Sequence, residues 1–90
     1  MKQSLYLQKT VYMRPISPEI LIEHGFAFQE TKKYYKIEVG NAAYGVVPQG
    51  GVWLFSPLPM QFASLENVLT IEDVDNIIFK STGKHLAGLQ

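Results

Sequence analysis

The sequence contains no cysteine, which excludes disulfides, thiolate metal sites and a cysteine nucleophile together. It has no excess of charge, because eight Lys and Arg balance eight Asp and Glu, so long nucleic acids and anionic membranes are poor partners. Its longest uncharged apolar run, AAYGVV, spans 6 residues, whereas a membrane helix needs about 20. We therefore expect a soluble, cytoplasmic protein without a membrane partner.

Apolar residues, by contrast, are abundant. They make up 47% of the 90 residues, which is enough to form the core of one domain spanning residues 1–90. This content exceeds what a domain of this size can easily bury. We therefore expect part of the apolar surface to contact a second copy of the chain, and predict a homo-oligomer.

Alternating apolar and polar residues predict strands in LYLQKTVYM (5–13) and KYYKIEVG (33–40). After the turn signal Gly40-Asn41, AAYGVV follows as a strand, and after PQGG (48–51) comes VWLF (52–55), so three of these strands form an antiparallel meander. The glycine pair in PQGG is typical of a hairpin turn, because no helix follows it as in a phosphate-binding loop.

Two helices are predicted from their end signals. The first begins after an N-cap at Ser17, with Pro18 in the first helical position, and ends at Gly25. The second begins after Thr70, runs for about 12 residues and ends at Gly83. The predicted fold class is α+β, an antiparallel sheet of four or five strands with two helices packed mainly on one face.

Two segments, PISPEILIEHGF (15–26) and VDNIIFKSTGKHL (74–86), resemble motifs of a family of small uncharacterised proteins of gut bacteria and their phages and mobile elements. The matching residues are Pro15, Leu21, Gly25, Phe26, Asn76, Phe79, Thr82 and Gly83. The resemblance covers about a third of the chain, and the family has no known activity. It implies an accessory protein of phage or mobile-element origin that binds a host component.

The sequence offers few groups for catalysis or metal binding. Glu23 and His24 are adjacent on the first helix and point about 100° apart, so they do not form a coupled pair, and we interpret His24 as a solvated helix end. Asp73 and Asp75 diverge on the second helix, and acidic residues are favoured in its first turn. We predict no enzyme activity, no catalytic residue, no metal and no cofactor.

Binding residues are predicted from aromatic and basic side chains. In KKYYK (32–36), lysines interleave with aromatics, as in proteins that bind phosphate and stack on a base. VWLF is apolar on both sides, so both sides must be covered, one by the helices and the other by the loop SPLPMQF (56–62), a protein partner or a ligand. The candidate binding residues are Trp53, Phe55, Tyr34, Tyr44, Lys32 and Lys36.

The leading functional prediction is a non-enzymatic binding protein of phage or mobile-element type that occupies a host protein, as a homo-oligomer. The alternative is a protein that sequesters a small nucleotide-like molecule by aromatic stacking, with a lysine at the phosphate. A further alternative is a structural component of a larger assembly.

Overall fold

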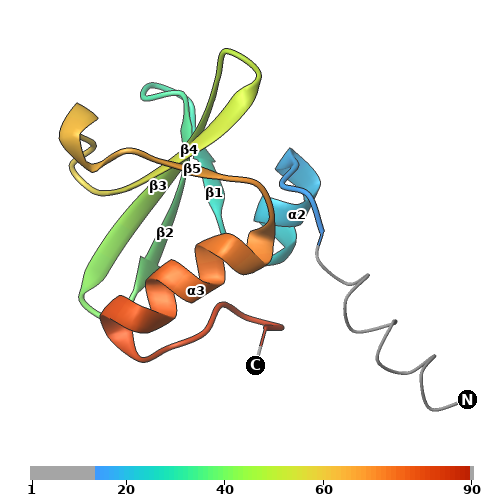
Figure 1. Ribbon diagram of the computed structural model, residues 1–90, viewed down its shortest axis with the longest axis vertical. Helices are drawn as coiled ribbons and strands as arrows, with labels where there is room; N and C mark the ends of the chain where they lie inside the picture. Colours follow the sequence, from blue (N-terminus) through green and yellow to red (C-terminus); the bar gives the residue numbers. More distant parts are fainter. Residues whose placement is uncertain (1–13, 90) are drawn as a thin grey trace, which may run out of the picture.

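The computed structural model describes residues 14–89, and the strand expected over residues 5–13 lies outside them (Figure 1). The elements are α2 (Pro18–Glu23), β1 (Ala27–Gln29), β2 (Tyr34–Val39), β3 (Ala42–Gln49), β4 (Val52–Pro57), the 3-10 helix η1 (Phe62–Ser64), β5 (Glu66–Val68) and α3 (Ile71–Thr82). Figure 1 shows α3 below the strands and α2 beside β1.

The strands form one antiparallel sheet in the order β1-β2-β3-β4-β5, so each pairs with its neighbours along the chain. Tyr35 pairs with Val46, and Val46 with Phe55, which places all three on one face. Both helices contribute apolar side chains to a single core on that face. The buried core residues are Ile16, Leu21, Phe26, Val39, Tyr44, Val46, Phe55, Val68, Ile71, Val74, Ile78 and Leu86. The predicted α+β fold is confirmed, with five strands among the described residues.

Both helices begin and end where their local signals predict. The Ser17 hydroxyl accepts a hydrogen bond from the backbone N–H of Ile20 at 3.1 Å, which satisfies a free donor at the start of α2. Thr70 and Asp73 form a reciprocal capping box at the start of α3. Gly83 ends α3 in the left-handed conformation, with φ of 76°, which a side chain would disfavour.

The turn between β3 and β4 is shorter than PQGG suggests. Gln49 pairs with Val52, so only Gly50 and Gly51 form the turn, with φ of 60° and 84°. Positive φ at both central residues matches the strand twist of a two-residue hairpin and favours glycine. Pro48 belongs to β3. The pairing of β3 with β2 ends at Val46, two residues before Pro48, so the missing N–H of the proline breaks no hydrogen bond to β2.

The two outer strands are three residues long and were not predicted. Each strand is too short to show an alternation of apolar and polar residues, so neither carries a local strand signal. Each forms because a longer neighbouring strand offers it hydrogen-bonding groups. Beyond β5, a bridge between Pro15 and Thr70 brings the segment before α2 alongside the start of α3.

Candidate functional site

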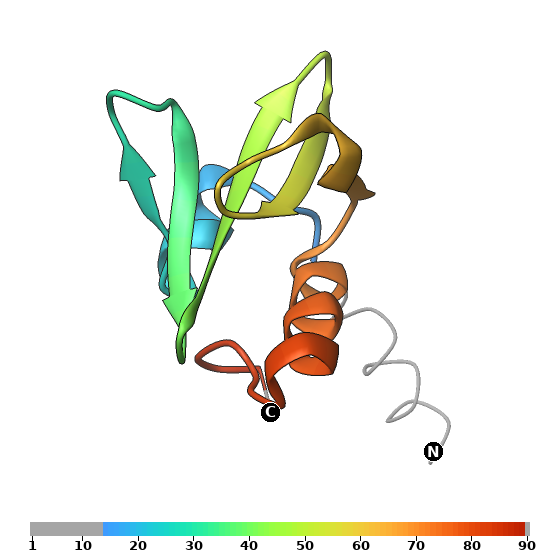
Figure 2. The ribbon, with the colours of Figure 1, turned by 90° about the vertical axis from the view of Figure 1, so that its left-hand side faces the viewer.

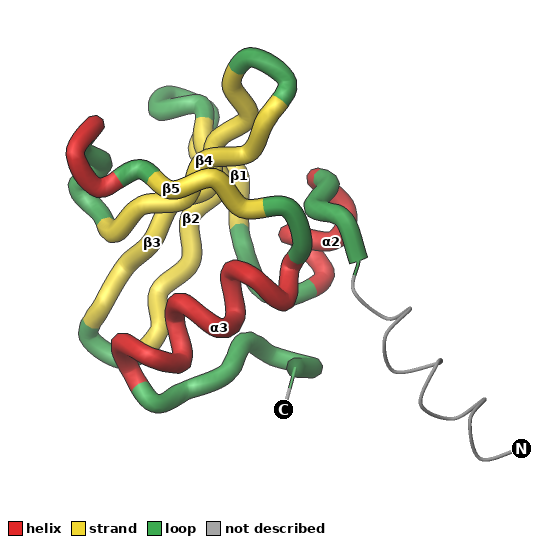
Figure 3. The backbone as a smooth tube through the Cα atoms, viewed as in Figure 1, coloured by secondary structure: helices red, strands yellow, loops and turns green. Residues whose placement is uncertain are grey.

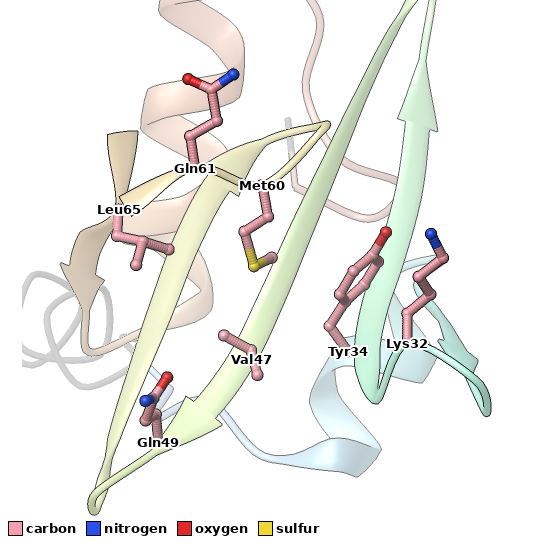
Figure 4. Close-up of a pocket in the computed structure, with 7 residues that line it drawn as sticks. All are labelled: Lys32, Tyr34, Val47, Gln49, Met60, Gln61 and Leu65. Carbon is pink, nitrogen blue, oxygen red and sulfur yellow. The ribbon is translucent and has the colours of Figure 1, made fainter. Parts of the chain in front are cut away.

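A groove of about 270 Å³ lies on the face of the sheet opposite the helical core (Figure 4). One wall comes from the start of β2, the floor from the end of β3, and the other wall from residues 58–65, which connect β4 to β5 and are called the strap below. The lining residues are Lys32, Tyr34, Val47, Gln49, Met60, Gln61 and Leu65.

Gly45 allows the strap to lie close to the sheet. A Cβ at this buried position would be 2.8 Å from Met60 Cε and 3.1 Å from Leu58 Cδ2, closer than side-chain carbons normally approach. The strap is also attached at its start, where the N–H of Leu58 donates to the carbonyl of Ala43 at 2.9 Å. Figure 2 shows the strap, in gold, arching past β3 and β4. A side chain at Gly45 would therefore displace the ends of the Met60 and Leu58 side chains from the sheet.

The groove combines an apolar interior with a polar rim. Figure 4 shows Met60 and Val47 between Tyr34 on one side and Leu65 on the other, with Gln49 and Gln61 at opposite ends. Lys32 lies beside Tyr34, and none of the seven lining residues is acidic. Within residues 14–89, no carboxylate forms an ion pair with Lys32. The groove can therefore hold an apolar group and present one ammonium to an acceptor at its edge.

Of the six predicted binding residues, two lie in this groove. They are Lys32, in the turn before β2, and Tyr34, the first residue of β2. Lys36 follows along β2 but pairs with Glu38 at 3.4 Å and lines a different hollow, beside β1. Its ammonium is therefore already engaged.

The other three predicted residues lie on the core face. Tyr44 and Phe55 are 4% and 1% exposed, and their rings stack with centroids 5.4 Å apart. Trp53 is partly buried against the same core and meets Tyr35 edge to face, with centroids 6.1 Å apart. The structure therefore does not bring these three rings together with Tyr34 in one site.

The groove also uses residues that the sequence pattern did not single out. Val47 and Gln49 come from β3, and Met60, Gln61 and Leu65 from the strap. The sequence indicated these residues only indirectly. VWLF is apolar on both sides, so its second side must also be buried, and the loop SPLPMQF (56–62) is one of the segments that can bury it. Cross-strand pairing places Leu54 beside Val47 on the groove face, where the strap provides that cover in part.

His24 is not the solvated helix end that the sequence suggested, because it is 3% exposed. Arg14 Nη2 donates to its Nε2 at 2.7 Å, and its Nδ1 donates to the carbonyl of Ala87. These two bonds define the neutral tautomer with the proton on Nδ1. The His24 side chain thus joins Arg14 and the end of α2 to the C-terminal tail, residues 83–89. This tail runs back beside α3 (Figure 3).

Comparison with family models, curated proteins and solved structures finds no match to this chain. Among residues 14–89, no group of three or more His, Asp or Glu side chains is placed to hold a metal ion. In the same part of the chain, no helix has both the length and the apolar character needed to cross a membrane.

Proposed function

We propose that this protein is a non-catalytic accessory protein that holds a short extended segment of a partner protein in the groove. The observation that supports this is the apolar interior formed by Val47, Met60 and Leu65, with the ammonium of Lys32 at its rim. Such a site suits an aliphatic side chain next to an aspartate or glutamate, because the first fills the interior and the second pairs with Lys32.

A host protein is proposed as the partner. The support is the resemblance of residues 15–26 and 74–86 to proteins of phages and mobile elements. A cytoplasmic location is part of the same proposal and fits a chain without cysteine.

A nucleotide is less suited to this groove than a peptide segment. Recognition of a nucleotide by stacking commonly uses aromatic rings around the base, and phosphate recognition uses several converging N–H groups or cations. Among the lining residues, Tyr34 is the one aromatic ring and Lys32 the one cation.

Panning a random heptapeptide display library on the immobilised protein tests the proposal. We expect enrichment of peptides that contain an aliphatic residue close to Asp or Glu. A fluorescein-labelled selected peptide should bind Lys32→Glu about tenfold more weakly than the wild type, because the substitution places a like charge opposite the peptide carboxylate. Fluorescence polarisation measures both affinities.

Lys36→Glu is the matched control for this experiment. It makes the same change of charge four residues further along the chain, on β2, but outside the groove. The selected peptide should bind it as it binds the wild type. Absence of any enriched motif, or equal weakening by both variants, contradicts binding in the groove.

Self-association is proposed through the edge of β1. This strand, Ala27–Gln29, carries no charge or proline, which are the usual protections of a sheet edge, and Phe28 is 38% exposed. The opposite edge strand, β5, begins with Glu66. We expect light scattering after size exclusion to give a dimer for the wild type and a monomer for Phe28→Lys, because lysine opposes pairing of the two edges.

Asn67→Lys introduces the same charge on β5 and should leave the dimer intact. A wild-type monomer contradicts self-association. A large particle in place of a dimer supports the alternative of a structural component.

A further inference from the structure

Asp75 and His85 form a pair on the opposite side of the core from the groove, where the C-terminal tail returns along α3. The Asp75 side chain is almost buried, since the residue is 7% exposed. Its Oδ1 accepts a hydrogen bond from the N–H of Leu86 at 2.7 Å, and its Oδ2 accepts one from Nδ1 of His85, also at 2.7 Å. The carboxylate therefore has a defined orientation with a partner for each oxygen.

This arrangement determines which nitrogen of His85 is free. A carboxylate accepts hydrogen bonds, so the proton of the neutral ring is on Nδ1 and the lone pair is on Nε2. Phe79 stacks on the ring, with centroids 4.2 Å apart and an angle of 12° between the planes, which restrains the ring further. The His85 side chain is 33% exposed, and no residue among 14–89 forms a hydrogen bond with Nε2. An oriented and accessible nucleophilic nitrogen results.

We propose that His85 is a modification site whose Nε2 accepts a phosphoryl group from an N-phosphoryl or acyl-phosphate donor. The Nε2 lone pair forms the new bond to phosphorus, and the bond from phosphorus to the leaving group breaks with its electron pair on that group. Nδ1 keeps its proton, so the ring becomes cationic. The Asp75 carboxylate stabilises that charge, the role of a carboxylate behind a nucleophile or base.

A phosphoryl group suits this position better than an organic acyl group. It is small and charged, so it remains in water and needs no apolar pocket around it. His24 provides the contrast within the same chain, because it is 3% exposed and both of its ring nitrogens are hydrogen-bonded. Of the two histidines, only His85 therefore offers a free nitrogen to a donor.

Treatment of the folded protein with potassium phosphoramidate tests this proposal. The ammonia of the donor leaves as the phosphoryl group transfers, so one phosphoryl mass should be added per chain. Tandem mass spectrometry should locate it at His85 and not at His24. Phosphorus NMR should show the Nε2 isomer alone, whereas the chain unfolded in urea should give both isomers at both histidines.

Asp75→Asn distinguishes a role in reactivity from a structural role. An amide can donate to Nδ1, which moves the ring proton to Nε2 and removes the nucleophilic lone pair, so phosphorylation should be roughly tenfold slower or more. Glu19→Gln removes one exposed carboxylate from α2 and should not change the rate.

Three results would overturn the proposal: no modification of His85, a rate in the folded protein no higher than in urea, or an unchanged rate in a folded Asp75→Asn variant. If that variant does not fold, comparison of the folded and unfolded wild type still decides the question.

Discussion

Replacing Phe55 by alanine is expected to remove about 3–5 kcal/mol from the free energy of unfolding, because it empties a fully buried position and leaves a cavity. Phe55 is 1% exposed and stacks on Tyr44 in the centre of the core. The total for a domain of 90 residues is roughly 5–13 kcal/mol, so the substitution should remove between about a quarter and nearly all of it. Urea unfolding followed by circular dichroism measures the loss.

Val52→Ala is the control for Phe55→Ala on the same strand. Val52 is 42% exposed, so its truncation should cost less than about 1 kcal/mol. The comparison also tests the earlier interpretation of Phe55 as a binding residue. A Phe55→Ala variant that is as stable as the wild type but fails to bind the groove peptide would favour binding over packing.

His24→Ala should cost about 3 kcal/mol, which is large for a residue at the end of a six-residue helix. The substitution removes a buried imidazole, which accepts a hydrogen bond from Arg14 and donates one to the carbonyl of Ala87, and leaves a cavity in its place. It should also loosen the C-terminal tail. We therefore expect faster hydrogen exchange at the N–H of Leu89, which bonds to the carbonyl of Leu86.

Glu23→Gln controls for the charge next to His24. The Glu23 side chain is 59% exposed and its contact with Arg14 is long, at 3.5 Å, so its loss should cost less than about 1 kcal/mol. If His24→Ala costs no more than Glu23→Gln, and exchange at Leu89 is unchanged, His24 behaves as a solvated helix end in solution.

The elements that the sequence predicted correctly have causes within a few residues. Ser17 and Thr70 cap donors that lie three positions later, and the Gly50-Gly51 turn needs only its own two positive φ values. The central meander also follows from local signals, namely the alternation in residues 33–40 and the glycine-containing turns before the next two apolar runs. Such features can be read without knowing what lies next to them in space.

The candidate site was predictable in part for the same reason. The KKYYK pattern pointed to Lys32 and Tyr34, and the groove contains both. It could not show that Tyr44 and Phe55 belong to the core, because a strand that is apolar on both sides does not reveal which face meets the helices. That assignment depends on how the whole sheet packs.

The sequence by itself determined the α+β class, both helices with their caps and the glycine turn, and it pointed to Lys32 and Tyr34. Tertiary structure alone decided the short outer strands, the burial of His24, the orientation of His85 by Asp75 and the position of the strap over Gly45. The physical reason is distance along the chain. His24 bonds to a carbonyl 63 residues away, and no local pattern encodes a contact that only the packed core brings together.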